Sequence, residues 1–210
     1  MENRILATVR VITLIAFISL PVLGWAAPTI LVLGDSLSAA YGIGIEQGWV
    51  ALLQKKLQAL RYTYNIINSS NGGDTTSNGL ERLPAALKQY QPAIVILALG
   101  SNDGLRGLPI DAMKNNLMQM AELAKQSHAK VLLVGFLIPL NYGPIYRQQF
   151  EQAFKDVADR YNLPRVPFLL ENVALHPELM QADGLHPNAT AEPIILDTLW
   201  PYLNDIGLAK

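Results

Sequence analysis

The chain has 210 residues, half of them hydrophobic, which suits one domain with a substantial core. Its 16 basic and 17 acidic residues nearly balance and no basic run stands out, so nucleic acid is not an expected partner. The absence of cysteine excludes disulfides, thiol catalysis and cysteine-ligated metals.

The first 26 residues have the pattern of a secretory signal peptide. Arg4 and Arg10 lie near the start, and the uncharged run 11–27 ends in small residues suited to a signal peptidase. An uncleaved membrane anchor is the alternative, but the run is broken by a proline and is shorter than the about 20 residues of a membrane span. We predict cleavage after Ala26 or Ala27, export to the periplasm or the medium, and no stable membrane span in the mature chain.

The mature chain, 27–210, alternates apolar runs with segments of helical periodicity. This alternation predicts a three-layer αβα sandwich around a parallel sheet. The expected strands are 29–33, 64–68, 93–100, 130–138 and 166–170. The expected helices are 48–60, 77–90, 111–127, 144–161 and 189–204.

Polar residues follow four of the five expected strands. Ligands of parallel sheets bind outside the carboxyl ends of the strands, so these residues should meet at one edge. Each pattern by itself is ordinary turn chemistry, and the shared placement is what predicts a site. The clusters are Ser36, then Gly72 and Gly73, then Asn102 and Asp103, and finally Asp183 and His186.

These residue types can carry serine hydrolysis. The Ser36 hydroxyl becomes a useful nucleophile when a base such as His186 takes its proton. Asp183, three residues before His186, could fix the tautomer of the imidazole. The oxyanion of the tetrahedral intermediate needs donors, for which the N–H groups of Ser36 and Gly73 and the amide of Asn102 are candidates.

Other polar residues have structural interpretations. Asp35 adjoins Ser36, and because neighbouring side chains diverge we interpret it as a turn or helix-start residue. His176 also precedes a proline, but Val173 rather than a carboxylate stands three residues before it. His128 closes an expected helix, where a cation suits the helix dipole.

Metal and cofactor sites are not predicted. A metal site built from the acidic cluster residues and His186 is disfavoured, because the chain has three histidines and no Asp-x-His pair. The sequence has no P-loop, no correctly spaced dinucleotide fingerprint and no G-x-S-x-G elbow. We therefore expect no cofactor.

Four ordered blocks, GDSLS, GGDTT, GSNDG and DGLHPN, resemble the SGNH (GDSL) hydrolases over about 29–205. Connecting segments such as NDGLRG and PLNYG resemble a bacterial periplasmic subfamily of thioesterases, arylesterases and lysophospholipases. The resemblance implies Ser36 as nucleophile, His186 as base and Asp183 as its acid. It also implies Ser36, Gly73 and Asn102 in the oxyanion hole, and a flavodoxin-like order of five strands.

Two positions near the oxyanion asparagine raise separate expectations. Ser101 stands where members of that subfamily usually carry a second glycine, and serine would be strained if the position needs a positive φ. The resemblance implies that the segment 103–110 is a mobile loop over the acyl site, with Leu105 and Arg106 binding substrate; a glycine-flanked loop can close on a substrate, and leucines can cover an acyl chain. An exposed connector is the alternative for this segment.

The sequence thus predicts a monomeric serine hydrolase that forms an acyl-enzyme. The resemblance implies that its substrates are small molecules with an acyl chain, namely acyl and aryl esters, lysophospholipids and acyl-CoA-type thioesters. A sugar O-acetyl esterase on the same framework is one alternative. A non-catalytic binding module is another, although the full set of catalytic residue types argues against it.

Overall fold

A five-stranded parallel sheet forms the centre of the protein. The computed structural model describes residues 27–208, and the predicted signal peptide lies outside them. The strand order is β2-β1-β3-β4-β5, which confirms the expected flavodoxin-like arrangement. The strands are β1 (Thr29–Gly34), β2 (Asn65–Asn68), β3 (Ile94–Ala98), β4 (Lys130–Val134) and β5 (Arg165–Val166).

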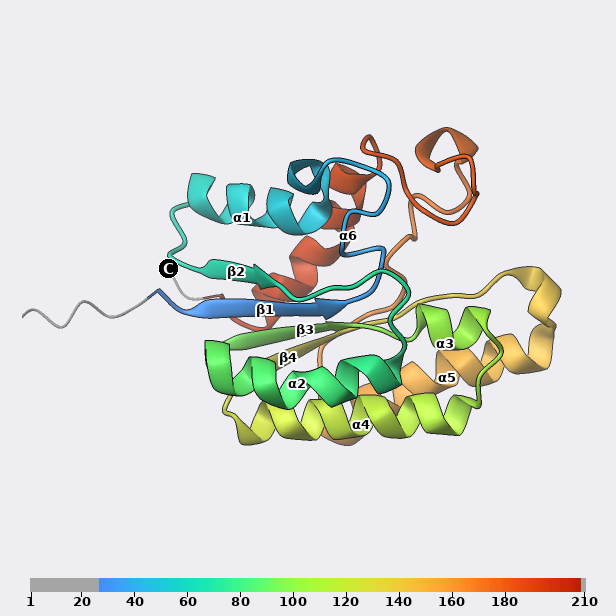
Figure 1. Ribbon diagram of the computed structural model, residues 1–210, viewed down its shortest axis with the longest axis horizontal. Helices are drawn as coiled ribbons and strands as arrows, with labels where there is room; N and C mark the ends of the chain where they lie inside the picture. Colours follow the sequence, from blue (N-terminus) through green and yellow to red (C-terminus); the bar gives the residue numbers. More distant parts are fainter. Residues whose placement is uncertain (1–26, 209–210) are drawn as a thin grey trace, which may run out of the picture.

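Helices cover both faces of the sheet and produce the three layers predicted from the sequence. Helices α1 and α6 lie on one face, and α2, α4 and α5 lie on the other (Figure 1). The helices are α1 (Trp49–Ala59), α2 (Thr76–Tyr90), α3 (Ser101–Leu105), α4 (Ile110–Gln126), α5 (Pro144–Tyr161) and α6 (Glu192–Asp205). Three short 3-10 helices are η1 (Ile45–Gln47), η2 (Leu140–Tyr142) and η3 (Pro177–Leu179).

The central strands are apolar throughout because both of their faces are covered. In β1, β3 and β4, residues 30–33, 94–98 and 131–134 are at most 3% exposed. The helices contribute large buried side chains to the two layers of core, among them Trp49, Leu53 and Leu57 of α1, Leu83 of α2, and Phe150 and Phe154 of α5.

The boundaries of the predicted helices lie within three residues of the observed ones. β2 is one residue shorter than expected, and β3, β4 and β5 are shorter by at least three residues. β3 and β4 stop before Leu99 and Phe136, which are buried without extending the ladder. β5 stops at Pro167, which has no N–H to donate to a neighbouring strand. Burial alone keeps these residues apolar, so their sequence resembles that of a strand.

The segment 103–110 is not the continuous loop that the sequence predicted. Its first residues belong to α3 and its last residue begins α4, so only 106–109 connect the two helices. A helix of five residues is too short to show an apolar period, which is why α3 was not expected.

The carboxyl ends of all the strands open at one edge of the molecule, on the right of Figure 1. Between residues 27 and 208, no helix combines the length and the apolar character that crossing a bilayer requires.

Candidate catalytic site

Ser36 follows β1 in a tight turn organised by its neighbour Asp35. The Asp35 carboxylate accepts from the Leu37 N–H at 3.0 Å, and its carbonyl accepts from the N–H groups of Ser38 at 3.1 Å and Ala39 at 3.0 Å. Asp35 is therefore a turn residue, as predicted. At Gly34 a Cβ would lie 2.7 Å from the Ser38 side chain, so glycine permits the turn to close.

Asp183 and His186 lie beside Ser36 as a connected triad. Ser36 Oγ is 3.0 Å from His186 Nε2, and His186 Nδ1 is 2.6 Å from Asp183 Oδ2. The carboxylate selects the tautomer in which Nδ1–H donates to it, which leaves Nε2 to accept from the Ser36 hydroxyl. This is the geometry that activation of a serine requires.

Local hydrogen bonds keep the Asp183 carboxylate charged. Its Oδ1 accepts from the backbone N–H groups of His186 at 3.0 Å and Leu185 at 2.9 Å. The His186 N–H, the His186 ring and the Leu185 N–H together lower the pKa of Asp183 to about 2. A carboxylate that stays ionised at neutral pH can orient an imidazole and stabilise its protonated form.

Tyr41 and Gln181, which the sequence did not indicate, contact His186. The Tyr41 ring packs on the His186 imidazole, with ring centroids 4.4 Å apart. Gln181 donates to the Tyr41 carbonyl at 2.7 Å, and its own N–H donates to the His186 carbonyl at 2.7 Å. The two contacts of Tyr41 join segments far apart in the chain, so no local sequence pattern predicts them.

Gly73 lies in the loop after β2 with a φ of +79°, a conformation that favours glycine. Its carbonyl accepts from Arg106 Nη2 at 2.8 Å. The next residue, Asp74, uses its carbonyl to accept from Asn102 Nδ2 at 3.0 Å. The loop that carries Gly73 and the Asn102 amide are therefore linked through the residue that follows Gly73.

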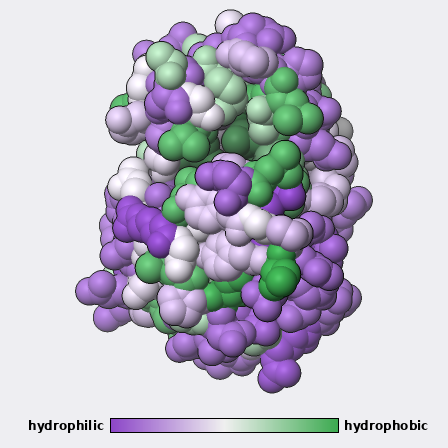
Figure 2. Space-filling model, turned by 90° about the vertical axis from the view of Figure 1, so that its right-hand side faces the viewer, coloured by the Kyte–Doolittle hydropathy of each residue, from purple (hydrophilic) through white to green (hydrophobic). Residues whose placement is uncertain are grey.

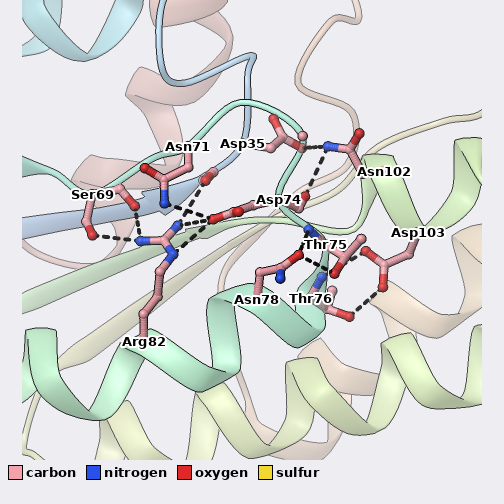
Figure 3. Close-up of polar contacts among 12 residues, drawn as sticks. Asp35, Ser69, Asn71, Asp74, Thr75, Thr76, Asn78, Arg82, Asn102 and Asp103 are labelled. Atoms are coloured by element: carbon pink, nitrogen blue, oxygen red, sulfur yellow. Dashed lines mark hydrogen bonds and ion pairs between the residues drawn. The ribbon is translucent and has the colours of Figure 1, made fainter.

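Asn102 lies on α3, directly after β3. Its amide also approaches Asp35 Oδ2 at 3.4 Å, so it faces the turn that carries Ser36 (Figure 3). The neighbouring Asp103 is buried, and its carboxylate accepts from Thr76 N at 2.9 Å and from Thr76 Oγ1 at 2.6 Å. Because Thr76 begins α2, these bonds anchor α3 to the N-terminus of that helix.

Ser101 is not strained, contrary to the concern raised by the sequence. The positive φ of +121° falls on Gly100, and Ser101 is not among the residues of positive φ. Its hydroxyl donates to Asp35 Oδ2. Burial raises the pKa of Asp35 to about 6, although the Ser101 hydroxyl and the Leu37 N–H oppose the shift. The sequence missed this second contact of the Asp35 carboxylate.

The two other histidines lie outside the triad, whereas the two predicted substrate-binding residues lie beside it. His176 is exposed and pairs with Glu178 at 3.1 Å, outside the triad, and His128 lies just after α4 with a φ of +62°. Leu105 and Arg106 lie at the end of α3 beside the site, where Leu105 O accepts from Tyr142 OH at 2.6 Å. Their binding of substrate remains a prediction.

The face that carries the triad is partly apolar. Figure 2 shows apolar side chains around a hollow on the side at which the strands end. Large exposed apolar residues of the segments that follow the strands include Tyr41, Leu108, Leu137, Leu140 and Leu185. A separate groove of about 620 Å³ lies between α4 and α5 and contains none of the triad.

In residues 27–208, no group of three or more histidine and acidic side chains is arranged to hold a metal ion.

Comparison with known proteins gives several matches over most of the chain. Residues 32–192 match the GDSL-like Lipase/Acylhydrolase family. Esterase TesA of Pseudomonas aeruginosa is 48% identical over 181 residues, covering 86% of this chain and 90% of that protein. Thioesterase 1/protease 1/lysophospholipase L1 of Escherichia coli K12 is 43% identical over 181 residues, 86% of each. The structure of the psychrotrophic esterase EstA from Pseudoalteromonas sp., inhibited by monoethylphosphonate, matches with a TM-score of 0.81 and 41% identity, covering 84% of this chain and 97% of that one.

Proposed function

Because the chain belongs to the GDSL-like Lipase/Acylhydrolase family, we propose that it hydrolyses carboxylic esters and thioesters with Ser36 as nucleophile. The observation that carries the proposal is the unbroken hydrogen-bond chain from Ser36 Oγ through His186 to Asp183. Ser36 and His186 are 150 positions apart in the sequence, so the fold itself brings them together. A hydrogen bond that only stabilised the fold would not require a serine, a histidine and an aspartate to be connected in this sequence of nucleophile, base and acid.

Acylation follows from this geometry. His186 Nε2 takes the hydroxyl proton while Ser36 Oγ forms a bond to the acyl carbonyl carbon. The positive charge that develops on the imidazole is balanced by the ionised Asp183. When the tetrahedral intermediate collapses, the bond to the leaving oxygen or sulfur breaks, and the same Nε2 returns the proton to the leaving group.

Deacylation repeats these steps with water as the nucleophile. His186 takes a proton from water, the new hydroxyl attacks the acyl-enzyme, and the carboxylic acid leaves as Ser36 regains its proton. In both halves the oxyanion is stabilised by the N–H groups of Ser36 and Gly73 and by the Asn102 amide. Each lost donor of this kind typically lowers kcat by on the order of 10²–10³.

The substrates we propose are small molecules with an acyl chain, including aryl esters, lysophospholipids and acyl-CoA-type thioesters. Support comes from the names of the relatives and from the apolar side chains on the catalytic face. We also propose that residues 1–26 are a signal peptide and that the mature enzyme is an exported monomer. N-terminal sequencing of protein recovered from the periplasm or the medium, with size-exclusion chromatography, tests these points.

Hydrolysis of p-nitrophenyl esters from acetyl to palmitoyl, together with an acyl-CoA thioester, tests the proposal. Activity should extend to medium or longer chains, should vanish in Ser36→Ala, and should survive in Ser77→Ala, a change at an exposed position of α2. A fluorophosphonate probe should label Ser36 in the parent protein. A strict acetyl preference would favour a sugar O-acetyl esterase, and absence of both turnover and labelling would favour a binding module.

A further inference from the structure

We propose that Arg82 is a positioning residue that holds the oxyanion hole in register from outside the reacting site. The inference rests on the proposed function, because it concerns the three donors assigned there. Arg82 lies on α2, and its guanidinium reaches the end of β1 and the loop that follows β2 (Figure 3).

Each nitrogen of the guanidinium is engaged. Nη1 donates to the Ser69 carbonyl and, at 2.8 Å, to Ser69 Oγ. Nε and Nη2 lie 2.9 Å and 2.8 Å from Asp74 Oδ2. Nη2 also donates to the Gly34 carbonyl at 3.3 Å. One side chain thus ties the end of β1 to both ends of the loop that follows β2.

Two of the three residues that Arg82 binds lie close in sequence to an oxyanion donor. Gly34 lies two residues before Ser36, and Asp74 directly follows Gly73. The Asp74 carbonyl accepts from Asn102 Nδ2 at 3.0 Å, so the same residue that Arg82 binds also orients the amide. Arg82 therefore acts on the Ser36 and Gly73 donors through the backbone that carries them, and on the Asn102 amide through the Asp74 carbonyl.

Backbone bonds from Ser69 N–H to Val32 O at 2.8 Å and from Asn71 N–H to Gly34 O at 3.1 Å hold the start of the loop 69–74, whereas its glycines are sparsely packed. At Gly72 no atom lies within 4 Å of where a Cβ would stand, and Gly73 has one neighbour, Arg106 Nη2, at 3.4 Å. Two adjacent glycines give the backbone large conformational freedom. A displacement of about 1 Å in a positioned group can cost on the order of 10²-fold in rate.

Two arginines hold this loop, and Arg82 is the more shielded. The Arg82 and Asp74 side chains are 24% and 15% exposed, whereas Arg106, which binds the Gly73 carbonyl, is exposed. Charge-assisted hydrogen bonds that are partly removed from solvent are stronger than exposed ones. Lysine cannot replace this geometry, since one ammonium cannot span Gly34, Ser69 and Asp74 together.

The test compares Arg82→Lys with the matched control Arg160→Lys, a change at an exposed position of α5. With p-nitrophenyl butyrate, Arg82→Lys should lower kcat about tenfold and leave KM within about twofold, while the control should match the parent. Asp74→Asn, which keeps the carbonyl that holds Asn102 but weakens the guanidinium pairing, should change kcat in the same direction. Unfolding midpoints of all variants identify any loss due to misfolding.

A double-mutant cycle with Asn102→Ala separates positioning from general stability. If Arg82 acts through the donors, Arg82→Lys should cost at least about threefold less in the Asn102→Ala background than in the parent. Parental kcat in both folded Arg82→Lys and Asp74→Asn, or equal costs in the two backgrounds, would overturn the inference. Failure of the proposed function is distinct, because the parent itself would then neither turn over esters nor label at Ser36.

Discussion

Glu192 should make the folded state more stable at mildly acidic pH than at mildly basic pH. Its side chain is 2% exposed at the start of α6, where Oε2 accepts from the Trp49 N–H at 2.7 Å. Burial raises the pKa of Glu192 from 4.5 to about 7, and the bond from Trp49 only partly opposes the shift. Substitution Glu192→Gln keeps an acceptor oxygen for Trp49 and removes the titration.

The sign follows from proton binding in the two states. Between pH 4.5 and about 7 the folded chain holds a proton on Glu192 that the unfolded chain has lost. Raising the pH through this window therefore lowers the free energy of unfolding, by at most about 1.4 kcal/mol per pH unit. The total contribution of this residue is up to about 3 kcal/mol, complete near pH 8. Asp35, with its pKa raised to about 6, adds a change of the same sign.

Urea unfolding at pH 5, 6, 7 and 8 measures this effect. Glu192→Gln should be close to the parent at pH 5 and more stable than the parent at pH 8, so the two curves diverge as pH rises. Glu81→Gln, at an exposed position of α2, is the matched control for removing a carboxylate. Parallel curves for Glu192→Gln and the parent from pH 5 to pH 8 would refute the reasoning.

The catalytic assignments make further predictions. Asn102→Ala should lower kcat by on the order of 10²–10³ with little change in KM, and an effect confined to KM would show that the amide only holds substrate. His186→Ala should cost about as much as loss of the serine, because the members of a catalytic unit do not act additively. Asp183→Asn should also cost heavily, since its bond to Nδ1 selects the tautomer. His176→Ala should leave kcat/KM within about threefold of the parent, and a large loss there with a mild one in folded His186→Ala would reverse the assignment.

The layered fold was predictable because its cause is visible in local patterns. A parallel strand covered on both faces must be apolar at every position, and a covering helix must be apolar on one side. The alternation of these two patterns specifies a sandwich. The edge that carries the site was predictable too, because parallel strands all end at the same edge. The pairing of Asp183 with His186 is local, within one loop.

What the sequence did not reveal depends on contacts between distant segments. The ends of β3, β4 and β5 were misjudged because buried residues beyond a strand are as apolar as those within it. The second contact of Asp35, with Ser101, joins residues 66 positions apart.

Glu192 and Trp49 are 143 positions apart, and Arg82 and Gly34 are 48 apart. The sequence by itself determined which residue types were available at the catalytic edge and which strand each of them follows. The tertiary structure alone decided which polar atoms meet there, because a hydrogen bond depends on the placement of two backbones to within a fraction of an ångström.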